Sequence, residues 1–69
     1  MDNQEENRIA RDAAREAGIR GRDWNNNRAI DLFMNEFHTL PRYERQSMGY
    51  SGIYQYARDW WSMNSGKFS

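Results

Sequence analysis

The chain has 69 residues, no cysteine, a single histidine and a formal net charge of zero. The absence of cysteine excludes a disulfide framework and, with only one histidine, disfavours a structural zinc site. With zero net charge, the protein lacks the broad basic field of a general nucleic-acid binder. A chain this short forms one domain, residues 1–69, that hides only about 60% of the surface its unfolded form exposes. We therefore expect a partner or a second copy to contribute stability.

Localisation follows from two further features. No apolar run approaches the roughly 20 residues of a membrane span, and neither cysteines nor an apolar N-terminal segment indicate secretion. We expect a cytoplasmic protein. We also expect the first few residues and residues 65–69 to be loosely held, apart from Phe68, which can fold back onto the core.

Residues 2 to about 17 are predicted to form the first helix. Acidic residues in its first turns suit the helix dipole, and Gly18 after its last residue is a C-terminal signal. One face is almost entirely alanine, so it permits close approach but buries little area. The opposite face carries an arginine stripe with acidic residues at helix-stabilising spacings; the arginines are Arg8, Arg11 and Arg15.

The connector from residue 18 to residue 27 is basic and contains two glycines and an indole, Trp24. Such a turn could hold a phosphate or stack a base, with Arg20, Arg22 and Arg28 supplying charge. A solvated loop with Trp24 folded onto the core is the favoured interpretation, because Arg-Gly-Arg is too short to be a motif.

A second helix is predicted over residues 27–39. Its apolar residues recur at helical spacing along one arc, and they are Ala29, Ile30, Phe33, Met34, Phe37 and Leu40. Leu32 falls outside this arc, on a face that should otherwise be polar. Pro41 disfavours helical geometry at Leu40, which places the end of the helix near His38 or Thr39.

A short extra helical turn is predicted over residues 41–47, followed by a turn at Met48 and Gly49. The third helix, residues 51–63, carries an apolar arc of roughly 180° at helical spacing, wider than the roughly 100° that one core contact needs. Ser51 is a plausible N-cap. The fold class is therefore all-α, a small three-helix bundle.

The width of this arc has two explanations. In the first, the helix is wedged between two others and both flanks are buried. In the second, one flank with Tyr50, Tyr54 and Trp61 stays on the surface for a partner, because Tyr and Trp combine large area with few rotors and a polar atom. The predicted partner-binding residues are Tyr50, Tyr54, Arg58, Trp60 and Trp61.

Nothing in the sequence predicts an enzyme. His38 has no convincing nucleophile or orienting acid beside it, and Asp31, Glu36 and His38 do not converge on one face as metal ligands would. No phosphate loop, dinucleotide fingerprint or nucleophile elbow is present. We expect no cofactor, no metal and no catalytic residue.

Three functions remain. The leading hypothesis is a non-enzymatic helical module that binds another protein, as an adaptor, an assembly subunit or an inhibitor encoded by a phage or mobile element. One alternative is a nucleic-acid-binding accessory protein that uses the arginine stripe and the connector arginines. The other is a homo-oligomeric scaffold that buries its surplus aromatic surface against a copy of itself.

Overall fold

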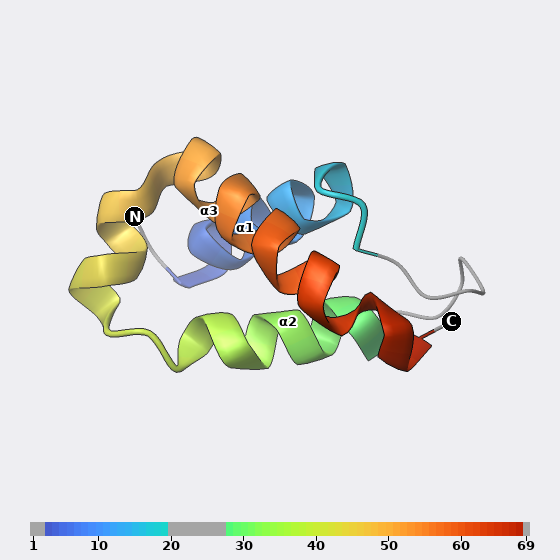
Figure 1. The fold of residues 1–69 in the computed structure, drawn as a ribbon. Helices are drawn as coiled ribbons and strands as arrows, with labels where there is room; N and C mark the ends of the chain where they lie inside the picture. Colours follow the sequence, from blue (N-terminus) through green and yellow to red (C-terminus); the bar gives the residue numbers. More distant parts are fainter. Residues whose placement is uncertain (1–2, 20–27, 69) are drawn as a thin grey trace.

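The computed structural model describes residues 3–19 and 28–68, and this part of the chain is all-α (Figure 1). Helices α1 (Asn3–Glu16), α2 (Arg28–His38) and α3 (Arg42–Asn64) are followed by a 3₁₀ helix, η1 (Ser65–Phe68). The predicted small three-helix bundle is confirmed. The interpretation of the connector, with Arg20, Arg22 and Trp24, lies outside the described residues.

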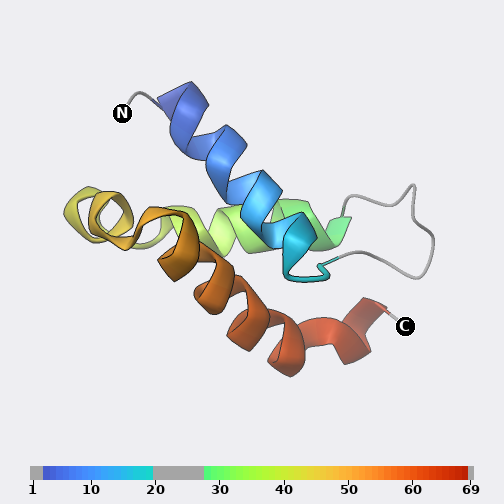
Figure 2. The same ribbon diagram turned by 90° about the horizontal axis from the view of Figure 1, so that it is seen from above.

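The helices form two layers. In Figure 1, α2 lies along one side of the molecule, and α1 and most of α3 lie on the other, while the last turns of α3 reach the level of α2. Figure 2 shows that α1 and the second part of α3 run in roughly the same direction, whereas α2 runs the opposite way beneath them. The most extensive contact between described helices is that of α1 with α3.

The buried face of α1 is made of small side chains, because Ala10, Ala13 and Ala14 are fully buried. The helix ends in a Schellman motif, in which the Gly18 amide donates to the Arg15 carbonyl and the Ile19 amide donates to the Ala14 carbonyl. Gly18 has a φ of 97°, a conformation that glycine adopts without strain. The predicted stop signal is confirmed, and Ile19 enters the core directly after it.

The connection from α2 to α3 follows the prediction from Pro41. Helix α2 ends at His38, and the Thr39 hydroxyl donates to the Glu36 carbonyl over 2.6 Å. Pro41 occupies the N-cap position of α3, with a ψ of 148°. Its carbonyl accepts the amides of Glu44 and Arg45, which starts the next helix at once.

A single residue separates the two parts of α3. Gly49, with φ 65° and ψ 179°, is non-helical, so α3 bends between its first part (42–48) and its second part (50–64). This confirms the predicted break between a short and a long helical segment. The N-cap prediction for Ser51 is wrong, because the helix resumes at Tyr50 and Ser51 lies within it.

Aromatic rings of α2 and α3 form the centre of the core. Phe33 and Phe37 are fully buried and stack with centroids 6.1 Å apart. Ile53 and Ala57 are buried on the facing part of α3. Helix α3 ends at Asn64, whose side-chain amide donates to the Trp60 carbonyl over 2.9 Å and so satisfies a carbonyl of the last turn.

Candidate functional site

The aromatic arc of α3 has a buried centre and two different flanks. Trp60 belongs to the centre: it is only 9% exposed and its ring meets Phe33 edge-on at 5.5 Å. Its predicted role as a surface anchor therefore does not agree with its position, because a side chain enclosed in the core offers almost no area to a partner. We assign Trp60 to the packing of α3 on α2.

One flank, represented by Tyr56, faces α2. The Tyr56 ring contacts Phe33 and Phe37 at centroid distances of 5.7 and 6.3 Å. Partial burial, and then the negative charges of Glu36 and Glu44, raise the pKa of the Tyr56 phenol. Tyr56 thus closes the α2 side of the core.

The other flank, beside the end of α1, is only partly exposed, and it carries four of the predicted partner-binding residues. Tyr50, Tyr54, Arg58 and Trp61 follow one another at spacings of four, four and three, so they form a row along α3. Tyr50 is 45% exposed, Arg58 is exposed, and Tyr54 and Trp61 are half-buried. The Arg58 guanidinium carbon lies 6.0 Å from the centroid of the Tyr54 ring, a cation–π distance. We call these four residues the aromatic row.

Trp61 is held in place from several sides. Its ring stacks on Trp60 with centroids 6.3 Å apart and an interplanar angle of 19°. The ring of Phe68 in η1 packs on the Trp61 ring with centroids 5.8 Å apart. On the other side, Cδ1 of Trp61 lies 4.0 Å from where a Cβ on residue 18 would stand. Within the segment 65–69 that we expected to be loosely held, Ser65–Phe68 form the 3₁₀ helix η1, and Phe68 folds back as predicted.

A hollow of about 390 Å³ lies beside the first half of the aromatic row. Two helices line it: α1 contributes its last residue, Glu16, and α3 contributes Tyr50, Ser51, Tyr54 and Gln55. Partial burial, and then the carboxylates of Glu16 and Asp12, raise the pKa of the Tyr50 phenol. We call this feature the tyrosine hollow. No pattern in the sequence predicts that Glu16 lines this hollow, because its position there depends on how α1 packs against α3.

Two arginines of the stripe on α1, Arg8 and Arg15, form ion pairs with carboxylates of the same helix. Arg8 lies 3.7 Å from Glu5 and 3.5 Å from Asp12, and Arg15 lies 3.5 Å from Asp12. These exposed ion pairs follow the helical spacings read from the sequence. Each of the two arginines therefore has an acidic neighbour that a phosphate ligand would have to displace.

The remaining arginines do not extend this stripe. Arg11 points to the other layer, where its guanidinium lies 3.3 Å from Asp31 of α2. Arg28 is exposed at the start of α2, while Arg20 and Arg22 fall outside the described residues. The structure thus places the predicted cationic residues on more than one face.

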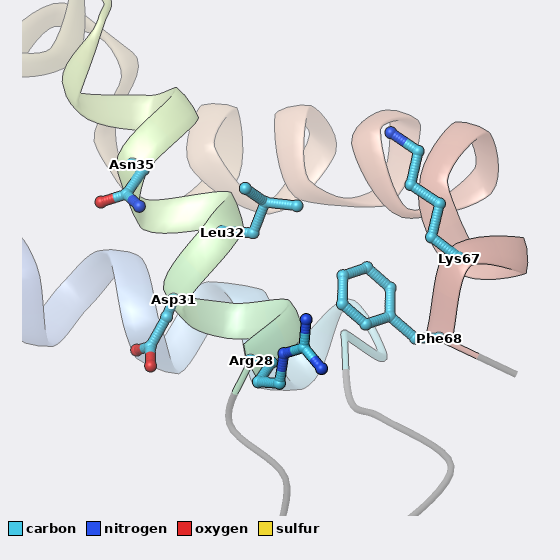
Figure 3. A pocket seen from close by; sticks show the side chains of 6 residues that line it. All are labelled: Arg28, Asp31, Leu32, Asn35, Lys67 and Phe68. Atoms are coloured by element: carbon cyan, nitrogen blue, oxygen red, sulfur yellow. The ribbon is translucent and has the colours of Figure 1, made fainter.

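A second hollow, of about 400 Å³, lies between the start of α2 and η1 (Figure 3). It is lined by Arg28, Asp31, Leu32, Asn35, Lys67 and Phe68. Figure 3 shows the Arg28 side chain beside the Phe68 ring, with Leu32 on the adjacent turn of α2. Leu32, which lies off the apolar arc of its helix, is exposed here as the pattern predicted.

A polar junction that sequence reasoning missed ties the three helices together at the other end of the molecule. Arg45 of α3 lies 3.1 Å from Glu6 of α1, and their side chains are only 13% and 3% exposed. The Arg45 guanidinium donates to His38 Nδ1, and His38 Nε2 contacts Asn7 Oδ1 over 2.8 Å. Because arginine can only donate, Nδ1 is the acceptor, which assigns a neutral imidazole with its hydrogen on Nε2. We call these four residues the polar junction.

Two buried polar atoms of the polar junction make no hydrogen bond to the described residues. Neither Glu6 Oε1 nor Arg45 Nε has a hydrogen-bond partner among the described residues, so the contact between the two side chains is an ion pair of imperfect geometry. No sequence signal could have found it, because Glu6 and Arg45 are far apart in the chain. The Glu6–Arg45 pair is enclosed between α1 and α3, whereas His38 at the edge of the junction is exposed.

Three further observations bear on the kind of site. Within residues 3–19 and 28–68, no group of three or more His, Cys, Asp or Glu side chains lies close enough together to hold a metal ion. Over the same residues, no helix combines the length and the apolar character needed to cross a membrane. Comparisons with protein-family models, with curated proteins and with solved structures gave no match to this chain.

Proposed function

We propose that this protein is a non-enzymatic helical module that binds another protein through the aromatic row on α3. The observation that carries the proposal is the partly exposed flank of α3, where the exposed Tyr50 and the half-buried Tyr54 and Trp61 share one stripe. Tyrosine and tryptophan are enriched among residues that dominate binding energies, because they bury large areas at a small cost in rotamer entropy.

The packing of the row supports this function. Trp61 is fixed between Trp60 and Phe68, and Arg58 lies over Tyr54. Side chains already held in one conformation lose little entropy when a partner covers them. The row thus offers a preformed surface, with Arg58 as a charged residue at its edge.

An adaptor, an assembly subunit or an inhibitor would each use such a surface. A small chain without cysteines is also typical of inhibitors encoded by phages and mobile elements, and we include this class in the proposal. The nucleic-acid alternative has less support, because Arg8, Arg11 and Arg15 all have carboxylates within ion-pair distance and the net charge is zero.

The test is capture of partner proteins from an extract of the source organism by the immobilised full chain. The variant combines Tyr50→Ala with Tyr54→Ala. The matched control is Tyr43→Ala, which removes a tyrosine that is 76% exposed on the first part of α3. We expect the double variant to lose more than about 2 kcal/mol of binding free energy, and the control to bind as the unchanged protein does.

Two measurements make the result interpretable. Far-UV circular dichroism must show that the double variant keeps its helical signal, and Trp61→Ala should weaken binding by a comparable amount. Equal capture by the double variant and the control would contradict the proposal. A steep fall of affinity with salt would favour nucleic acid instead, because phosphate contacts release counterions.

A further inference from the structure

We propose that the tyrosine hollow is a subsite for an arginine side chain of the partner protein. This inference rests on the proposed function, since it names the chemistry of the group that the first half of the aromatic row receives. Its evidence is the composition of the hollow, the state of Glu16, and the electrostatic field at Tyr50.

The lining of the hollow matches a cation with a flat, apolar surface. It combines two aromatic rings, Tyr50 and Tyr54, with one carboxylate, Glu16, and with the neutral polar side chains of Ser51 and Gln55. None of these lining residues is basic. Aromatic faces attract cations through their quadrupole, and a carboxylate beside them adds a direct charge interaction.

Glu16 differs from the other acidic residues of α1. Asp12 is already shared by Arg8 and Arg15, whereas Glu16 is exposed and has no ion-pair partner in the described part of the chain. Because no described residue forms an ion pair with it, this carboxylate at the edge of an aromatic hollow can pair with a cation from another molecule.

The field in the hollow has the sign that this ligand requires. After partial burial, the largest contributions to the raised pKa of the Tyr50 phenol are the negative charges of Glu16 and Asp12. The same charges that disfavour a phenolate at Tyr50 favour a positive group next to its ring.

A guanidinium fits this arrangement better than an ammonium. It is planar and weakly hydrated, so it can lie against a tyrosine ring while its N–H groups bond to a carboxylate in a bidentate manner. Lysine presents a compact, strongly hydrated charge. The protein already contains one such contact within itself, because the Arg58 guanidinium lies over Tyr54, and Arg58 is not among the residues that line the hollow.

The experiment is a titration of the ¹⁵N-labelled full chain, followed by NMR, with N-acetyl-arginine amide. N-acetyl-citrulline amide is the matched neutral probe, because it keeps the shape of the arginine side chain and removes its charge. We expect saturable shifts at Tyr50, Tyr54 and Glu16 with the arginine probe, and a citrulline affinity lower by roughly fivefold or more. The lysine derivative should bind more weakly than the arginine derivative.

Two variants test the role of the carboxylate. Glu16→Gln removes the charge while keeping the size of an exposed side chain, and it should abolish most of the preference for arginine over citrulline. Glu36→Gln is the control, because Glu36 is an exposed carboxylate on α2 outside the hollow, and it should leave the preference unchanged. The amide spectrum of each variant reports that the fold is retained.

The outcomes separate the two proposals. Equal affinities for arginine and citrulline, or an arginine preference that survives Glu16→Gln, would overturn the subsite. If capture of a partner protein nevertheless depends on Tyr50 and Tyr54, the proposed function stands without it. An arginine preference lost on Glu16→Gln supports the subsite. Partner capture that ignores both tyrosines would contradict the aromatic row as the contact surface, and with it the assignment of the partner's arginine to the hollow.

Discussion

Replacing Arg45 by methionine should destabilise the fold more than any other change to a charged pair in the described structure. Glu6 would keep a carboxylate that is 3% exposed with no countercharge beside it. Breaking a buried ion pair by removing one partner costs about 3–5 kcal/mol. At about 0.05–0.15 kcal/mol per residue, a chain of 69 residues has a total free energy of unfolding of roughly 3–10 kcal/mol, so much of that stability would be lost.

The double variant Glu6→Leu with Arg45→Met provides the decisive comparison. It removes both charges together, and replacement of a buried pair by apolar side chains is often neutral or stabilising. We therefore expect the double variant to recover most of the stability lost by Arg45→Met alone. Glu6→Leu alone should cost less than Arg45→Met, because Arg45 is 13% exposed and keeps its bond to His38.

Urea unfolding followed by far-UV circular dichroism measures these differences, with the m-value as a check on two-state behaviour. The matched control is Arg15→Met, which breaks the exposed pair with Asp12 and should change the free energy of unfolding by less than about 1 kcal/mol. The reasoning would be refuted if Arg45→Met cost no more than Arg15→Met, or if the double variant were less stable than Arg45→Met.

Three further predictions, the first with a control variant, test the backbone, the core and the pH response. Gly49→Ala should cost about 1–3 kcal/mol, since φ 65° and ψ 179° suit only glycine. A Cβ would meet open space at both Gly49 and Gly66, but only Gly49 has a positive φ. The control Gly66→Ala should therefore be neutral or stabilising in thermal unfolding. The pKa of Tyr56 is raised on folding. The contribution of its protonated phenol to the free energy of unfolding is therefore present below about pH 10 and is lost as pH rises through the folded-state pKa. Melting temperatures of Tyr56→Phe should accordingly fall less steeply in alkali, and equal slopes would contradict this. Trp60→Ala should cost about 3–5 kcal/mol in urea unfolding, and a loss below about 1 kcal/mol would show that Trp60 is not core.

The helices could be predicted because their signals are local. The apolar arc of α2 and the stop at Pro41 placed that helix at residues 27–39, and it spans Arg28–His38. The turn at Met48 and Gly49 was predicted for the same reason, and Gly49 alone is non-helical. The N-cap at Ser51 failed because a single glycine can turn the chain and let the helix resume one residue later.

The site was less predictable because it depends on packing. Trp60 and Trp61 are neighbours in the sequence and both lie within the apolar arc of α3, so periodicity cannot tell which one α2 will cover. The structure encloses Trp60 and leaves Trp61 half-buried. Glu16 and Glu6 looked like ordinary polar residues of α1, and only the positions of Tyr50 and Arg45 give them distinct roles.

The alanine face of α1 has a consequence for how that helix finds its place. Ala10, Ala13 and Ala14 present nearly identical methyl groups, so a shift of α1 by one turn would exchange one methyl for another at little cost. The correct alignment must then be set at the two ends, by Glu6 meeting Arg45 and by Ile19 entering the core after the last turn. The small side chains let α1 pack closely on its neighbours, and the two contacts at its ends determine its position along its own axis.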